Sequence, residues 1–94
     1  MSDSTQTRDM VVVNPLGLHA RPAAMFVKTA AKFDSDIMVE KDGYKVTGKS
    51  IMGLITLEAC KGTKLKISAE GHDAVEALDA LEEVLNTDFN EEGS

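Results

Sequence analysis

The sequence predicts one α+β domain, an open-faced β-sandwich in which a four-stranded, mainly antiparallel sheet carries three helices on one face. The chain has 94 residues, about the length of one small domain. Its hydrophobic fraction is 43%, with 4% aromatics, which is enough for one modest core. The apolar periodicity also changes between strand and helix type in the order βαββαβα. Many unrelated proteins share such an architecture, so the fold alone names no function.

The first half of the chain predicts a strand and then a helix. The β-branched run "MVVVN" at residues 10–14 is typical of a buried strand. A helix is predicted to begin near Ala20, because proline at position 22 suits a first helical turn. Its apolar side chains fall on one stripe at steps of three and four, namely Pro22, Phe26, Thr29, Ala30 and Phe33.

A hairpin is predicted next, and it accounts for a stretch that resembles a nucleotide-binding loop. Residues 36–41 and 44–48 are two short strands joined by Asp42-Gly43, a strong two-residue turn signal. The stretch "GYKVTGKS" at residues 43–50 matches the letters of a phosphate-binding nucleotide loop. Its variable positions alternate as a strand does, and no later strand supplies a metal-holding aspartate in the expected setting. We therefore interpret the match as accidental.

The second half predicts a helix, a strand and a helix. Ser50 is expected to cap a short helix over residues 51–59, and Gly62 suits the end of that element. In the strand over residues 63–71, Leu65, Ile67 and Ala69 share one face. The last helix is predicted to open with a capping box of Asp73 and Glu76. It packs five apolar residues inward: Ala74, Ala77, Leu78, Leu81 and Leu85.

Composition limits the partners and the compartment. A net charge of −6 and a pI near 4.7 argue against a protein that binds nucleic acid or an anionic membrane surface. Cys60 is the single cysteine and is expected to be a small apolar filler; no metal site or cofactor is predicted. Without a membrane-length apolar run or a leader, we expect a cytoplasmic protein. The domain is expected to span 10–87, between polar, frayed ends at 1–9 and 88–94.

One histidine stands where phosphate chemistry is favourable. His19 comes immediately before the predicted helix, and Arg21 follows two residues later. A helix start offers unpaired amide hydrogens and partial positive charge, so an anion on His19 would meet the amides of Ala20 and Arg21 and a guanidinium. A neutral imidazole can attack phosphorus, and Arg21 can share the charge of the phosphoryl oxygens. The alternative is that His19 is an ordinary exposed helix cap.

Two sequence blocks resemble one known family. "GLHARPA" looks like the active-site signature of the HPr family, the histidine-containing phosphocarriers of the bacterial phosphoenolpyruvate-dependent sugar phosphotransferase system. "GKSIMGLITLEACKGT" resembles the regulatory-serine region of the same family, at a fitting spacing. The resemblance covers roughly residues 10–85. It implies a phosphocarrier with a transient phosphohistidine and no turnover as an enzyme.

The resemblance also implies roles and partners. His19 matches the histidine that receives phosphate on Nδ1 from enzyme I and passes it to the A component of a sugar permease. Arg21 matches the active-site arginine. Ser50 matches the serine that an HPr kinase/phosphorylase modifies in many bacteria, which would allow binding to a transcription regulator. The alternative for Ser50 is a helix cap and nothing more. A monomer is expected.

The short helix after Ser50 is expected to carry a docking surface. Leu54 and Leu57 can face the sheet, which leaves Ile51, Met52 and Ile55 nearer solvent as a patch for enzyme I and permease components. The alternative places all three in the core. Lys28 and Lys49 resemble family positions near acidic partner surfaces, whereas Ala31 stands where some members carry a basic residue. His72 is interpreted as a surface residue.

Three functional hypotheses stay open. The first is the phosphoryl carrier, which the intact pair of His19 and Arg21 favours. The second is a regulatory binding module controlled by phosphorylation of Ser50. The third is a nitrogen-branch carrier, to which the tail "NTDFNEE" is faintly similar, although "KSIMG" resembles the sugar-branch type more closely.

Overall fold

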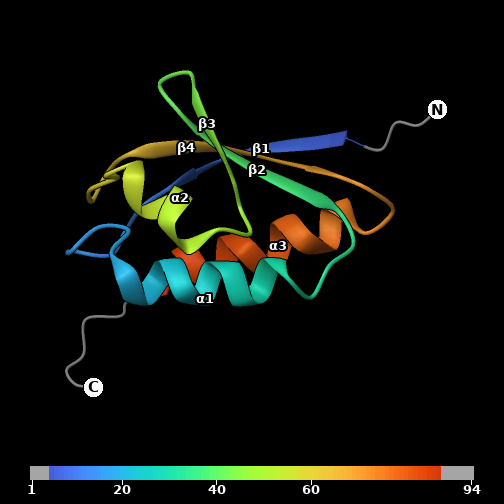
Figure 1. The fold of residues 1–94 in the computed structure, drawn as a ribbon, viewed down its shortest axis with the longest axis horizontal. Helices are drawn as coiled ribbons and strands as arrows, with labels where there is room; N and C mark the ends of the chain where they lie inside the picture. Colours follow the sequence, from blue (N-terminus) through green and yellow to red (C-terminus); the bar gives the residue numbers. More distant parts are fainter. Residues whose placement is uncertain (1–4, 88–94) are drawn as a thin grey trace.

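The computed structural model describes residues 5–87 and has the predicted open-faced β-sandwich (Figure 1). The elements, in chain order, are β1 (Thr5–Val11), α1 (Ala20–Ala30), β2 (Asp36–Lys41), β3 (Tyr44–Thr47), α2 (Ile51–Thr56), β4 (Lys64–Glu70) and α3 (Ala74–Leu85). The four strands form one antiparallel sheet in the order β1-β4-β2-β3. The βαββαβα order predicted from the sequence is confirmed.

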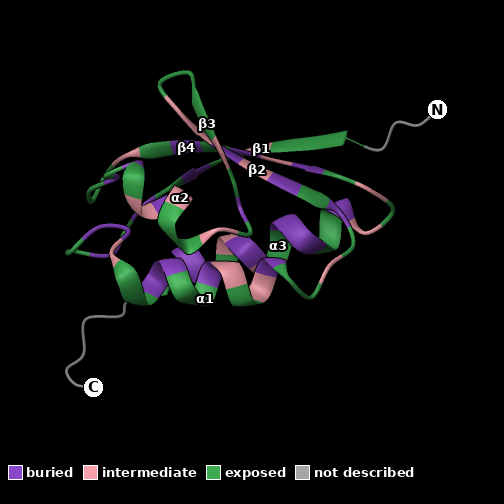
Figure 2. Ribbon diagram, in the orientation of Figure 1, coloured by how far each residue is buried: buried purple, intermediate pink, exposed green. Residues whose placement is uncertain are grey.

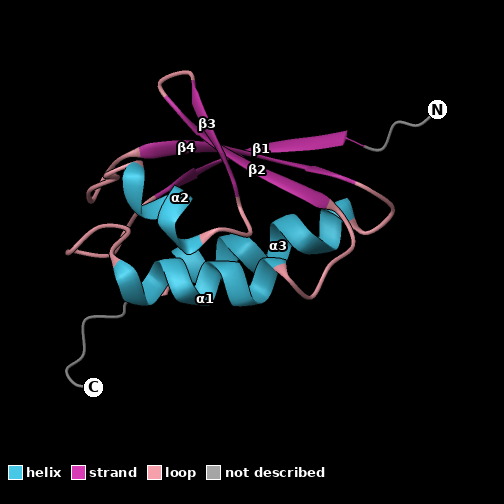
Figure 3. Cartoon of the chain, in the orientation of Figure 1, coloured by secondary structure: helices cyan, strands magenta, loops and turns pink. Residues whose placement is uncertain are grey.

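All three helices cover the same face of the sheet, with α1 and α3 side by side (Figure 3). The buried side chains gather between the two layers, while the other face of the sheet is mostly exposed (Figure 2). The predicted inward stripes of β4 and α3 lie in this core. The largest core side chains are Phe26, Ile37, Leu54, Leu65, Ile67, Leu78 and Leu81.

The first strand begins earlier than the sequence predicted. We expected a strand at residues 10–14 after a frayed segment 1–9, but β1 starts at Thr5, which lies opposite Glu70. The side chains of Thr5 to Asp9 are polar and exposed or half-buried, so the start of this strand lacks the apolar pattern of a core strand. Arg8 also ties β1 to α3 through ion pairs of 2.9 Å from Nη1 to Asp79 and to Glu82. Residues 1–4 and 88–94 lie outside the described part of the chain.

The hairpin between β2 and β3 is confirmed. Asp42 and Gly43 have φ values of 53° and 86°, the left-handed conformations of a tight two-residue hairpin turn. The middle of the "GYKVTGKS" stretch is β3 itself. It therefore forms a strand and not a phosphate-binding loop. The preceding helix α1 ends at Ala30, so Phe33 lies in the following turn and packs at the margin of the core.

Two expectations about the segment after α2 are wrong. Gly62 does not end the helix: α2 stops at Thr56, and Gly62, with φ of 92°, lies in the turn before β4. Cys60 is exposed and is not a core filler. The short loop between α2 and β4 carries Cys60 to the surface, where its amide donates to Thr63 Oγ1 at 3.1 Å.

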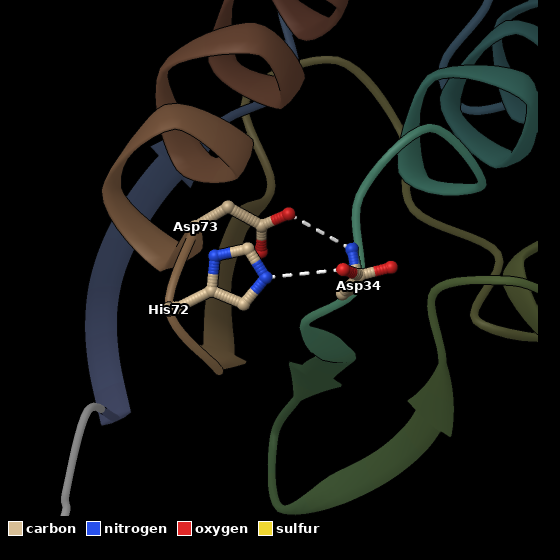
Figure 4. Close-up of side chains that lie close together, drawn as sticks. All are labelled: Asp34, His72 and Asp73. Carbon is tan, nitrogen blue, oxygen red and sulfur yellow. Dashed lines mark hydrogen bonds and ion pairs between the residues drawn. The ribbon is translucent and has the colours of Figure 1, made fainter.

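The predicted capping box at α3 is also wrong. Asp73 is the residue before the helix, but its carboxylate makes no hydrogen bond to the first turn. It accepts hydrogen bonds instead from the amides of Asp34 and Ser35, at 2.9 and 3.0 Å, and from the buried hydroxyl of Ser35. Asp73 thus joins the loop before β2 to the loop before α3 (Figure 4).

Within residues 5–87, no helix has the length and apolar character needed to cross a bilayer.

Candidate functional site

His19 is the residue immediately before α1, as predicted. Its backbone is extended, with φ of −88° and ψ of −168°, and its carbonyl accepts the amide of Ala23 at 3.0 Å. The His19 side chain does not cap the helix, and the first turn of α1 contains no acidic residue. The amides of Ala20 and Arg21 therefore point into a helix start whose partial positive charge no carboxylate of that turn offsets.

The two nitrogens of the His19 ring are not equivalent. The side chain is half-buried, and Nε2 is fully covered without a hydrogen-bond partner. A covered nitrogen cannot meet a ligand that arrives from solvent. An incoming group can therefore reach a lone pair of this ring only at Nδ1.

Arg21 lies in the first turn of α1 and is exposed. Its guanidinium is permanently charged and carries several N–H donors suited to phosphate oxygens. The three residues of the predicted phosphate site, His19, Ala20 and Arg21, thus stand consecutively at the start of α1. Pro22 follows them and is buried, which anchors the helix start in the core.

The loop before His19 is fixed by a network of hydrogen bonds that sequence reasoning missed. The Oδ1 of Asn14 accepts the amide of Leu16 at 3.0 Å, and the carbonyl of Asn14 accepts the amide of Gly17 at 2.9 Å. Leu18 then donates to the carbonyl of Ala59 at 2.8 Å. Asn14 in front of the Gly17 turn was the available signal, because asparagine commonly accepts the amide two residues on.

Ser50 caps α2 as predicted. Its Oγ accepts the amide of Gly53 at 3.0 Å, and its backbone is extended, with φ of −126° and ψ of 117°. The helix that it caps packs against α1 and β3. Ser50 and His19 therefore stand at the starts of two neighbouring helices on the same side of the sheet (Figure 1).

The residues expected to form a docking patch differ in their exposure. Ile51 and Met52 are exposed, at 40% and 69% of their surfaces. Ile55 is partly buried and packs against the core, so its placement near solvent is only half right. Helix α2 has only six residues, and Ile55 directly follows Leu54, the buried residue of this helix. Sequence reasoning missed Leu16, which is 71% exposed in the loop before His19.

The two candidate lysines differ in their contacts. Lys28 is exposed in the last turn of α1. Lys49 donates from Nζ to the carbonyl of Phe33 at 3.1 Å, just past the end of the same helix. Lys49 therefore has a structural contact in addition to any role at a partner surface.

A second cluster of polar side chains lies at the opposite end of α1. Asp34, His72 and Asp73 have possible ligand atoms within 4.8 Å of one another. His72 is exposed, as predicted, but its Nε2 lies 3.0 Å from Asp34 Oδ2 (Figure 4). That hydrogen bond, with the nearby charge of Asp73, raises the pKa of His72. The hydroxyl of Ser35 and the amide of Asp34 lower the pKa of Asp73.

The comparisons with known proteins agree with this geometry. The family model of the PTS HPr component phosphorylation site matches residues 6–87. The chain belongs to the HPr family. Phosphocarrier protein HPr of Neisseria meningitidis is 45% identical over 80 residues, which cover 85% of this chain and 90% of that protein. The HPr resemblance and the general role of a phosphocarrier in the phosphotransferase system, as opposed to an enzyme, are thereby supported.

Solved HPr structures share the fold. The crystal structure of HPr from Thermoanaerobacter tengcongensis superimposes with a TM-score of 0.85 at 49% identity, covering 93% of this chain and 98% of that one. An HPr dimer from the same organism has a TM-score of 0.72 at 55% identity and covers 80% of this chain and 86% of that one. Some HPr proteins are therefore dimeric.

Proposed function

We propose that His19 carries a phosphoryl group between phospho-enzyme I and the A component of a sugar permease. In the first step, Nδ1 attacks phosphorus, the Nδ1–P bond forms, and the bond between phosphorus and enzyme I breaks. In the second step, a nucleophile on the A component takes the phosphoryl group, and the Nδ1–P bond breaks. His19 leaves the cycle unchanged, so the protein acts as a carrier.

The observation that carries this proposal is the helix start itself. His19 sits at an uncapped helix start with its Nε2 covered, so a phosphoryl group on Nδ1 would lie beside the amides of Ala20 and Arg21. Amide hydrogens and the helix dipole favour that dianion. The guanidinium of Arg21 would add charge-assisted hydrogen bonds to the phosphoryl oxygens, most strongly where charge spreads during transfer.

The experiment that tests the proposal compares the two histidines of the chain. The protein is incubated with phosphoenolpyruvate and enzyme I, and acid-labile, alkali-stable phosphate is measured. His72→Ala is the matched control, because it removes the other histidine. We expect His72→Ala to accept phosphate as the natural protein does and His19→Ala to accept none. Labelling of His19→Ala, or no labelling of the folded natural protein by its host's enzyme I, would contradict the proposal.

A docking surface around the site would serve both partners. Leu16, Ile51 and Met52 expose apolar side chains on the loop and short helix at the same side of the domain as His19. Ile55 contributes only its uncovered part, and Lys28 and Lys49 would face acidic groups on the partners. Methionine suits a surface that must fit unlike partners, since its side chain adapts its shape.

Regulation at Ser50 is the second candidate function. A phosphate on Ser50 would be bonded to Oγ, the atom that accepts the amide of Gly53, and it would place about two negative charges beside the docking residues Ile51 and Met52. Such charge would hinder partners that approach as apolar or acidic surfaces. The same phosphate would provide a binding site for a transcription regulator.

The regulatory candidate is tested by incubating the protein with ATP and an HPr kinase/phosphorylase. We expect phosphate on Ser50, absent in Ser50→Ala, and slower phosphoryl transfer from enzyme I after modification. Equal transfer rates before and after modification would remove this role. A purely regulatory module would keep the Ser50 reaction and fail the His19 test above.

The carrier proposal also includes the compartment, the oligomeric state and the partners of the protein. It places the protein in the cytoplasm as a monomer that meets enzyme I and permease components in turn. A nitrogen-branch carrier would use the same His19 chemistry. The two branches are separated by measuring which enzyme I, sugar-branch or nitrogen-branch, transfers phosphate faster.

A further inference from the structure

Asn14 occupies an unusual position for a polar side chain. It is 3% exposed, and among the described residues it shares this degree of burial with only one other polar residue, Ser35. Ser35 lies at the far end of the domain, where its hydroxyl donates to Asp73. Asn14 instead lies five residues before His19. A buried amide in that place requires an explanation, because burying polar groups costs stability unless they are paired.

Asn14 supplies both acceptors for the turn that leads to His19. Its Oδ1 accepts the amide of Leu16 at 3.0 Å, and its carbonyl accepts the amide of Gly17 at 2.9 Å. On either side of this turn the chain is held by the loop and turn that follow α2. Val12 exchanges hydrogen bonds with Gly62 and Thr63, and Leu18 donates to Ala59. Between Val12 and Leu18, the hydrogen bonds that hold the turn are those accepted by Asn14.

Burial of the Asn14 side chain is not explained by its contribution to folding stability. The Nδ2 of Asn14 is buried without a hydrogen-bond partner. An unpaired buried donor costs free energy, which opposes the stabilisation that the hydrogen bond at Oδ1 contributes. The other buried side-chain nitrogen without a partner in the described chain is Nε2 of His19, at the end of the same loop. Features that lower folding stability, such as unpaired buried polar groups, are concentrated at functional sites.

We propose that Asn14 is a positioning residue for phosphoryl transfer at His19. Its Oδ1 sets the turn from residue 14 to residue 17, and the turn fixes the direction in which the chain enters α1. That direction determines whether Nδ1 and the amides of Ala20 and Arg21 meet one phosphoryl group. Displacing a reacting atom by about 1 Å can cost about a hundredfold in rate, so a loose turn would slow transfer. The inference rests on the proposed role of His19.

The test measures the steady-state rate at which phospho-enzyme I transfers phosphate to the protein. It compares the natural protein with Asn14→Ala, Asn14→Ser and Ser35→Ala. Alanine removes the acceptor, whereas a serine hydroxyl can still accept the amide two residues on. Ser35→Ala is the matched control, since it removes the other buried polar side chain. The thermal unfolding of each variant is measured to establish whether it is folded at the assay temperature.

We expect Asn14→Ala to lower kcat about tenfold with little change in KM, and Asn14→Ser to recover part of the loss. Ser35→Ala should lower the melting temperature and leave kcat within about twofold. The NMR shifts of the His19 ring should move in Asn14→Ala and not in Ser35→Ala. Natural kcat in folded Asn14→Ala, or a change confined to KM, would overturn the inference. Failure of the natural protein itself to accept phosphate would instead refute the role of His19.

Discussion

The amide of Leu18 donates to the carbonyl of Ala59 at 2.8 Å, so the loop that ends in His19 is fastened to the segment that follows α2. Gly17 makes this contact possible. Its φ is 77°, and a Cβ at this position would lie 2.5 Å from the Ala59 oxygen. The loop before His19 and the segment after α2 therefore approach so closely that only glycine fits at position 17.

Gly17→Ala is expected to destabilise the protein by more than about 2 kcal/mol, because it combines a left-handed backbone with a clash against fixed backbone atoms. Gly62→Ala is the matched control: Gly62 also has a positive φ, of 92°, but has open space around the added carbon. Its cost should be about 1 kcal/mol. Urea unfolding measures both. Equal losses of stability would show that the approach to Ala59 carries no constraint.

Ser50→Ala is expected to cost about 1 kcal/mol of stability, because it removes the acceptor for the Gly53 amide at the start of α2. Ser50→Asp keeps an acceptor there and should lose less. Denaturant unfolding of the two variants checks the order. If alanine were as stable as aspartate, the cap would contribute little, and Ser50 would have to be explained by modification alone.

Met52→Asp is expected to raise the KM for phosphoryl transfer from enzyme I by about tenfold, which corresponds to about 1.4 kcal/mol of lost docking energy. Met52 is 69% exposed beside the site, so the change should leave the fold intact. Val75→Asp is the control, since Val75 is 49% exposed at the start of α3, away from α2. Similar KM values for both variants would place the docking surface elsewhere.

The pair of His72 and Asp34 predicts a pH dependence. The hydrogen bond to Asp34 raises the pKa of His72 above 6.5 in the folded protein. A raised folded pKa means that the contribution to stability is complete below the unfolded pKa and is lost as pH rises through the folded value. Asp34→Asn should bring the pKa of His72 back towards 6.5 and flatten this dependence.

An NMR titration of the His72 ring measures that shift directly. Asp42→Asn removes the same charge from the hairpin turn and should leave the pKa of His72 unchanged. A His72 pKa that is the same in the natural protein and in Asp34→Asn would mean that the contact does not persist in solution.

The parts of the fold that the sequence predicted correctly depend on local patterns. The hairpin at Asp42 and Gly43, the inward stripe of α3 and the cap at Ser50 each involve residues a few positions apart. The position of His19 at the start of α1 is of the same kind. Short-range rules of turn conformation, periodicity and capping were therefore sufficient for these features.

The errors concern residues whose partners are distant in the chain. Asp73 bonds Ser35, 38 positions away, and so does not cap its own helix. The polar start of β1 at Thr5 pairs with Glu70, which no local pattern signals. Asn14 has a local partner in Leu16, but its burial results from packing of the whole domain. Such features follow from tertiary contacts and are not visible as sequence periodicity.

The most direct test of the central claim is ³¹P and ¹⁵N NMR of the protein after phosphorylation by phosphoenolpyruvate and enzyme I. The structure covers Nε2 of His19, so the account predicts one phosphohistidine, with phosphorus bonded to Nδ1 of that residue. Phosphorus on Nε2 of His19, or on His72, would contradict it.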